Sequence, residues 1–270
     1  MPNNAPSRFI KSVSTALLIF VSFGCATAPD PSDTESYAEF QAINDPLEPL
    51  NRSVFEFNRA LDAMFLRPFA DFYRLLLPPP FQEGVHNVLA NLRSPVILVN
   101  DLLQGEWQRA GTTAQRLVVN TTMGVGGISD PASDFGLPAH SEDFGQTLAV
   151  WGLPEGPFLM LPVIGPSSPR DATGLAIDSL IIDPLGLMNT LGAQDEWLPA
   201  FMLTRFALTA VDARAQNAEE LDDLEKSSLD FYAALRSLYR QFRIAEIHQG
   251  QPPPGAQGPS LDDFPAIPLE

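Results

Sequence analysis

The stretch that decides the fold is Asp45-Pro46-Leu47-Glu48, which is followed by an apolar stripe at helical spacing. Asp45 is a suitable N-cap, Pro46 suits the first helical position, and Glu48 stands three residues after the cap, as in a capping box. Apolar side chains then recur every three or four residues, at Val54, Phe57, Leu61, Met64 and Phe65. The pattern predicts an amphipathic helix that Pro68 kinks or ends.

Helical patterns continue along most of the chain and predict an all-α fold. The apolar stripe resumes at Phe69 and stops at three consecutive prolines, residues 78–80. Further helices are predicted over residues 81–92, 95–103, 107–119, 198–215 and 218–247. Residues 153–169 are rich in proline and glycine and lack the alternation of a half-buried strand, so we expect Pro/Gly-rich loops there and no sheet.

The composition divides the chain into four segments. Residues 1–24 carry Arg8, Lys11 and no acid before a short apolar run, which is typical of a signal peptide and too short to span a bilayer. Residues 25–44 form a polar, acidic tether. Residues 45–249 form one helical domain, and residues 250–270 are a disordered Pro-rich tail.

Cys25 is the only cysteine, and it stands where the signal peptide should be cut. Gly24 before it and Ala26 after it resemble the lipobox of bacterial lipoproteins, in which the cysteine is the lipid attachment site. The alternative cut after Ala28 would leave Pro29 next, which signal peptidases disfavour. Several acyl chains hold a protein stably to a bilayer, and Ala26 in place of aspartate favours the outer membrane of a Gram-negative cell.

The charge balance limits the possible partners. With 16 Lys+Arg against 33 Asp+Glu, the 270-residue chain has a formal charge of -17. This excludes the basic surface that a nucleic-acid binder needs, and a polybasic membrane contact as well. The chain has 18 phenylalanines and 4 tyrosines, and phenylalanine must be covered either by a large ordinary core or by lipid.

No constellation of residues requires an enzyme. His86, His140 and His248 form no cluster, and a nucleophile-elbow motif is absent. The Gly124–Gly127 segment lacks the strand and the Lys-Ser/Thr ending of a phosphate-binding loop. We expect no catalytic residues, no metal and no cofactor, and we expect the acid pair Asp222 and Asp223 to be solvated.

Several stretches, taken together, resemble the VacJ/MlaA lipoproteins of intermembrane phospholipid transport. The resemblance covers roughly residues 40 to 245, in order and with similar spacing. The matching stretches are DPLEPLNR at 45–52, NDLLQG at 100–105, NTTMGVGG at 120–127, EDFGQTL at 142–148 and GPS at 165–167.

The resemblance implies a ring-like arrangement of amphipathic helices around a central channel, lipid-anchored at the periplasmic face of the outer membrane. It implies removal of mislocalised phospholipid from the outer leaflet and its transfer to a soluble periplasmic carrier, which maintains lipid asymmetry. It also implies association with a porin trimer. Two alternatives are a structural envelope lipoprotein that scaffolds porins without moving lipid, and an envelope hydrolase with an unrecognised Ser/His/Asp set.

The resemblance also suggests where a channel could be controlled. The first helix influences channel behaviour in the family, so Phe57 and Asn58 are gate candidates. The glycine-rich segment could flex or line a passage, which adds Met123, Gly124, Gly126 and Gly127; the alternative is a plain turn. Residues 153–165 could shape the pore or a ridge against the leaflet, or form a buried loop.

Overall fold

The computed structural model describes residues 32–33, 43–192 and 195–250. Helices dominate this part of the chain, which confirms the all-α prediction. The expected signal peptide, Cys25, nearly all of the tether and nearly all of the tail lie outside the described residues. Within the described ranges, no helix is both long enough and apolar enough to cross a membrane.

The first helical arm is continuous through Pro68. Helix α3 (Glu48–Leu61), the π-helix η1 (Asp62–Leu66) and α4 (Arg67–Leu76) follow one another without a break. Pro68 lies in the first turn of α4, and the wider π turn precedes it. A π-helical insertion accommodates an irregularity without ending a helix. Of the two predicted outcomes at Pro68, a kink or an end, the end is therefore wrong.

Asp45 is buried and does not cap α3, contrary to the sequence prediction. The N-cap is Leu47, which makes no side-chain capping hydrogen bond. The Asp45 carboxylate accepts hydrogen bonds from Asn51, Tyr232 and Arg236 instead. Since Tyr232 and Arg236 belong to the last helix, Asp45 joins the two ends of the described domain.

One long helix replaces the two predicted on either side of Pro95. Helix α5 (Pro79–Gln104) contains Pro95 in its interior. A short turn at Gly105, with φ of 81°, leads into α6 (Trp107–Thr122), which returns along α5. Packing along α6 outweighs the local cost of the proline, because tertiary context overrides helix propensity.

The middle of the chain contains a β-hairpin that the sequence pattern did not predict. Strands β1 (Leu159–Leu161) and β2 (Gly165–Ser167) pair antiparallel, with Leu159 opposite Ser167. Three residues per strand are too few for a visible alternation. Short helices precede and follow the hairpin in the sequence: α7 (Pro131–Asp134), α8 (Phe144–Val150), α9 (Pro169–Ile177), η2 (Asp178–Ile182) and α10 (Pro184–Thr190).

Three helices complete the domain: α11 (Trp197–Gln216), α12 (Ala218–Ser227) and α13 (Phe231–Ile247). The single helix predicted over residues 218–247 is broken at residues 228–230. Asp230 accepts a hydrogen bond from the Ala233 amide and caps α13, so its side chain starts a new helix.

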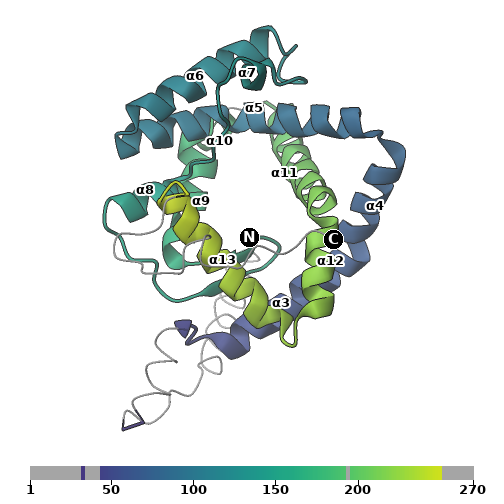
Figure 1. The fold of residues 1–270 in the computed structure, drawn as a ribbon, viewed down its shortest axis with the longest axis vertical. Coiled ribbons are helices and arrows are strands. Elements are labelled where there is room, and N and C mark those ends of the chain that lie inside the picture. Colours follow the sequence, from purple (N-terminus) through teal and green to yellow (C-terminus); the bar gives the residue numbers. More distant parts are fainter. Residues whose placement is uncertain (1–31, 34–42, 193–194, 251–270) are drawn as a thin grey trace, which may run out of the picture.

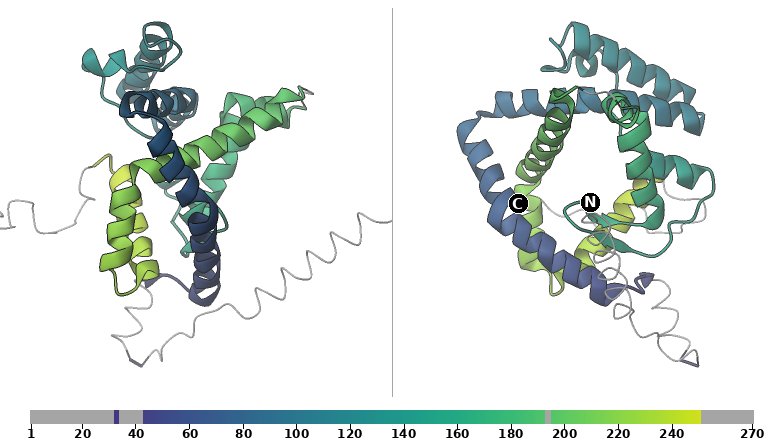
Figure 2. Two further views of the ribbon diagram at one scale, coloured as in Figure 1. Left: turned by 90° about the vertical axis from the view of Figure 1, so that its right-hand side faces the viewer. Right: turned by 180° about the vertical axis from the view of Figure 1, so that it is seen from behind.

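The helices form an open ring. Figures 1 and 2 show α5, α11, α12, α3, α13, α9 and α10 around one circuit, with α6 and α7 outside α5. Ion pairs of α13 close the circuit. Arg236 contacts Asp45 at 2.7 Å, and Arg243 contacts Asp143 before α8 at 2.7 Å and Asp171 in α9 at 2.9 Å. These bonds explain why the first and last helices lie together.

The core is small for so apolar a chain. Among the described phenylalanines, only Phe55 and Phe158 are buried. An outward stripe on η1 and α4 is more than half exposed at every position, at Phe65, Phe69, Phe72 and Leu76. A large ordinary core would bury such side chains, so this distribution favours a covering of lipid or of partner protein.

Candidate functional site

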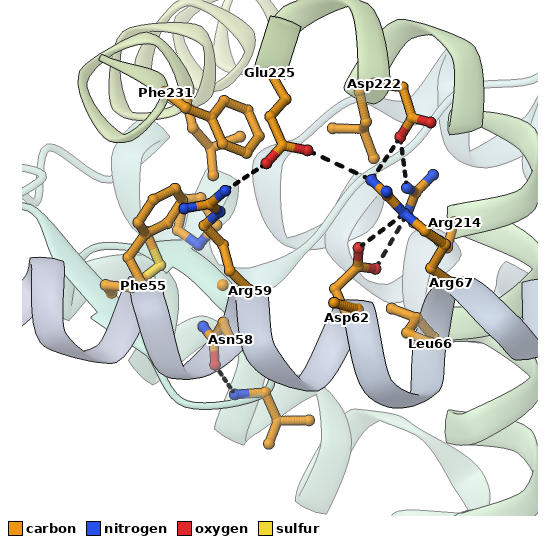
Figure 3. A pocket seen from close by; sticks show the side chains of 17 residues that line it. Phe55, Asn58, Arg59, Asp62, Leu66, Arg67, Arg214, Asp222, Glu225 and Phe231 are labelled. Carbon is orange, nitrogen blue, oxygen red and sulfur yellow. Dashed lines mark hydrogen bonds and ion pairs between the residues drawn. The ribbon is translucent and has the colours of Figure 1, made fainter.

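A cavity of about 330 Å³ lies between the first helical arm, the hairpin and the last three helices (Figure 3). Its charged side is formed by six side chains, which we call the ion-pair wall: Arg59, Arg67, Arg214, Asp62, Asp222 and Glu225. Its apolar side includes Phe55, Leu66, Met160, Val163, Phe231 and Leu235.

The ion-pair wall joins the first helical arm to α12 and α11. Arg59 donates to Glu225 at 2.6 Å, and Arg67 donates to Asp222 at 2.9 Å. Arg214 completes the wall from α11, where its Nε lies 3.1 Å from Asp62 and its Nη2 lies 2.8 Å from Asp222. The sequence prediction that Asp222 and Asp223 are solvated holds for Asp223, whose side chain is 81% exposed. The Asp222 side chain is 34% exposed and also binds two guanidinium groups.

Asp222 and Arg59 stay ionised at neutral pH. The hydrogen bond from Arg214 lowers the pKa of Asp222 below its usual range, and the charge of Arg67 adds to this effect. The hydrogen bond to Glu225 raises the pKa of Arg59. The cavity therefore presents fixed charges of both signs opposite an apolar surface, an arrangement that suits an amphiphilic molecule.

Asn58 borders the cavity and fixes the hairpin to α3. Its side chain donates to the Leu161 carbonyl at 2.9 Å and accepts from the Val163 amide at 2.8 Å. Asn51 makes the equivalent pair with Phe158 and Met160, at 3.0 and 2.9 Å. The two asparagines are seven residues apart on α3, which is a rise of about 10.5 Å. Their hairpin partners are three residues apart, which is about 10 Å of extended chain. The spacing of the two side chains on the helix therefore matches the spacing of their partners on the hairpin.

Phe57 lies on the same helix but does not line the cavity. Its side chain is 51% exposed, and Asn58 beside it is partly buried. The structure thus places the two gate candidates on different faces of α3. Asn58 contacts the hairpin, and Phe57 belongs to the exposed apolar surface.

The glycine-rich segment forms a compact turn at the end of α6, on the far side of α5 from the ring opening (Figure 1). A Cβ on Gly124 would lie 2.4 Å from the carbonyl oxygens of Asn120 and Ser129. Gly126 and Gly127 have φ of 73° and 95°, and Met123 is exposed. The structure does not bring these residues to the cavity.

His86 and His140 pair with different acids. His86 is 3.0 Å from Asp212, and His140 is 3.0 Å from Asp101 and 3.2 Å from Thr113. Both partners of His140 contact the same ring nitrogen, whereas a nucleophilic triad uses the two different nitrogens. Within the described residues, no group of His, Cys, Asp and Glu could hold a metal ion.

Sequence reasoning missed the ion-pair wall. Arg59, Asp62 and Arg67 are close in sequence, but a basic residue near an acid on a helix is usually part of a solvated face. Their partners on α11 and α12 are more than 150 residues away, so no local pattern signals the wall.

The mainly helical ring, with one short β-hairpin, an exposed apolar stripe and a two-sided cavity, defines a class of ring-shaped helical proteins. The MlaA lipoprotein family matches residues 43–246, and the chain belongs to that family.

Two relatives and one solved structure are similar to this chain. The chain is 34% identical over 205 residues to a Rickettsia bellii protein, covering 76% of this chain and 77% of the relative. It is 30% identical over 247 residues to the intermembrane phospholipid transport system lipoprotein MlaA of Haemophilus influenzae, covering 89% and 92%. A solved structure from work on the structural basis for maintenance of bacterial outer membrane lipid asymmetry has a TM-score of 0.64, with 32% identity and coverage of 75% and 98%.

Proposed function

We propose that this chain is a lipid-anchored outer-membrane protein that removes mislocalised phospholipid from the outer leaflet and passes it to a soluble periplasmic carrier. The result is maintenance of lipid asymmetry, and no bond is made or broken. The phospholipid-transport name of the Haemophilus influenzae relative supports this proposal.

The observation that carries the proposal is the two-sided cavity. A phospholipid has a charged headgroup and apolar tails, and the ion-pair wall faces an apolar wall across the cavity. The volume of about 330 Å³ is at the lower end for ligand pockets. The cavity therefore suits a headgroup with the first part of its tails, while the rest of the lipid extends toward the ring opening.

The exposed apolar stripe supports a position in the membrane leaflet. Phe69 and Leu76 on α4 are each about 60% exposed, and their burial in acyl chains contributes about 25 cal/mol per Å². Acyl chains on Cys25 would hold the ring at that depth. Exposed apolar faces also suit contact with a porin trimer. The Haemophilus influenzae relative is named as a lipoprotein of a phospholipid transport system, and a soluble periplasmic carrier would be another component of such a system.

We propose Asn58 as a gate residue that acts through the hairpin it holds beside the cavity. Phe57 would sense the surrounding acyl chains from the outer face of the same helix. The Met123–Gly127 turn, with Gly124, Gly126 and Gly127, would act on the channel indirectly, by setting the position of α6 against α5.

The test measures phosphatidylethanolamine in the outer leaflet of cells that lack this gene, with an amine reagent that does not cross membranes. We expect labelling to rise in the deletion strain and to return to normal with the wild-type gene. The Cys25→Ala variant should not restore it. Unchanged labelling in the deletion strain would contradict lipid transport. Purified protein that binds porin but carries no phospholipid by mass spectrometry would favour the scaffold alternative.

A further inference from the structure

The ion-pair wall carries equal numbers of opposite charges. Arg59, Arg67 and Arg214 face Asp62, Asp222 and Glu225, so the wall is neutral in a chain with a formal charge of -17. Burying an unpaired charge is costly. A ligand that binds against this wall without an energetic penalty must therefore be uncharged or must carry one positive and one negative charge.

Arg67 keeps donors that its protein partners do not use. A guanidinium has five N–H donors. Among the described residues, only Nη2 of Arg67 makes hydrogen bonds, to Asp222 at 2.9 Å and to Glu225 at 3.4 Å. Its Nε is buried without a hydrogen-bond partner, and the acid paired with it, Asp62, lies 3.8 Å away, beyond hydrogen-bond distance. Such groups are uncommon and costly, and phosphate is an acceptor that suits a guanidinium especially well.

Glu225 is the acid best placed to receive an amine. One carboxylate oxygen binds Arg59 at 2.6 Å, and the other has, within the described part of the chain, only the long contact to Arg67, at 3.4 Å. The Glu225 side chain is 32% exposed. When a phosphate attracts Arg67, this second oxygen is released and can accept a hydrogen bond from an ammonium group beside the phosphate.

We propose that the ion-pair wall binds a zwitterionic headgroup that carries a phosphate and a primary amine, as in phosphatidylethanolamine. The phosphate binds Arg67 and the amine binds Glu225. This inference rests on the proposed function, since the headgroup belongs to the lipid that is moved. An anionic headgroup such as phosphatidylglycerol brings a negative charge close to Asp222 and Glu225 and supplies no cation to offset it.

The experiment offers the full lipidated protein vesicles with equal amounts of phosphatidylethanolamine and phosphatidylglycerol of identical acyl chains. The protein is recaptured in mild detergent, and its bound lipids are measured by mass spectrometry. We expect about tenfold enrichment of phosphatidylethanolamine, because one charge-assisted hydrogen bond changes a binding constant by about this factor. The Glu225→Gln variant should lose most of this enrichment, because a neutral amide has no negative charge to offset the ammonium.

Glu219→Gln is the matched control. It makes the same change of charge on the same helix, but Glu219 pairs with Arg74 outside the cavity and its side chain is 83% exposed. This control should keep the wild-type ratio. Arg67→Lys provides a second test that keeps the charge but removes the forked donors, and it should also lower the ratio. Circular dichroism of each variant confirms that the helices are retained.

Equal binding of the two lipids by the wild type would overturn the inference, as would a wild-type ratio in both Glu225→Gln and Arg67→Lys. Loss of the ratio in the Glu219→Gln control would also overturn it, because the effect would then be one of general surface charge. Displacement of the bound lipid by an equal concentration of soluble glycerophosphoethanolamine would assign the wall to a free metabolite. A wild-type protein that binds neither lipid would contradict the proposed function itself.

Discussion

Replacing Asn51 by alanine should cost far more stability than replacing Asn58, although both side chains bind the same hairpin. Asn51 is 2% exposed, and it bonds to Asp45 at 2.8 Å, to Phe158 and to Met160. Its removal takes the Asn51 partner from the buried Phe158 carbonyl and Met160 amide and one of three hydrogen bonds from Asp45, at a cost of about 3–5 kcal/mol. Asn58 makes two bonds, one of them to the exposed Val163 amide, so water replaces part of the loss and the cost is about 1 kcal/mol.

Thermal unfolding followed by circular dichroism measures the difference. About 1 kcal/mol shifts the midpoint of a domain of this size by 2–4 °C. Asn51→Ala should therefore lower the midpoint by roughly 10 °C, and Asn58→Ala by about 3 °C. Hydrogen exchange provides the local readout: Asn58→Ala should speed exchange at the Val163 amide while α5 stays protected. Equal midpoints for the two variants, or unchanged exchange at Val163, would refute this description of the hairpin.

Three further predictions concern packing, acid stability and the membrane surface. A Cβ on Gly174 would lie 2.2 Å from a backbone nitrogen of α8, whereas one on Gly111 meets nothing within 4 Å. Gly174→Ala should therefore destabilise the fold by about 1–3 kcal/mol and Gly111→Ala should stabilise it by up to about 1 kcal/mol; denaturant midpoints that move together would count against the packing. Burial alone would raise the pKa of Asp171, but hydrogen bonds, chiefly from Arg243, outweigh this effect and lower the pKa to about 2. The carboxylate thus contributes about 2 kcal/mol that is present above about pH 4 and lost as the pH falls toward 2. Acid titration of Asp171→Asn should lack that loss, and an unchanged profile would contradict the assignment. Phe69→Asp, at an exposed position, should leave the unfolding midpoint nearly unchanged but reduce recovery of the unlipidated domain with floated vesicles; equal recovery would argue against this surface as the membrane contact.

Local patterns predicted the helices because a helix is specified by neighbours three and four residues apart. The stripe of Phe65 and Phe69 therefore located η1 and α4 correctly. Local patterns also misplaced helix ends at Pro68 and Pro95, where a π turn and packing against α6 override the proline preference. The three-residue strands are too short for a periodic signal.

The candidate site could be predicted only in part. Asn58 came from the family resemblance, and the structure places it beside the cavity with the hairpin. Glu225 could not be found from sequence, because it pairs with Arg59 across 166 residues of chain. Ion pairs at such separations depend on the closed ring, and the ring is determined by contacts such as Arg236 with Asp45.

The most direct test of lipid passage fills the cavity and leaves the rest of the ring unchanged. Ala63 is exposed and lines the cavity, and Ala60 is exposed on the preceding turn but does not line it. Tryptophan at either position adds the same bulk without disturbing the core. Outer-leaflet phosphatidylethanolamine should be as high in cells carrying Ala63→Trp as in the deletion strain, and normal with Ala60→Trp. Full restoration of asymmetry by Ala63→Trp would contradict the claim that phospholipid passes through this cavity.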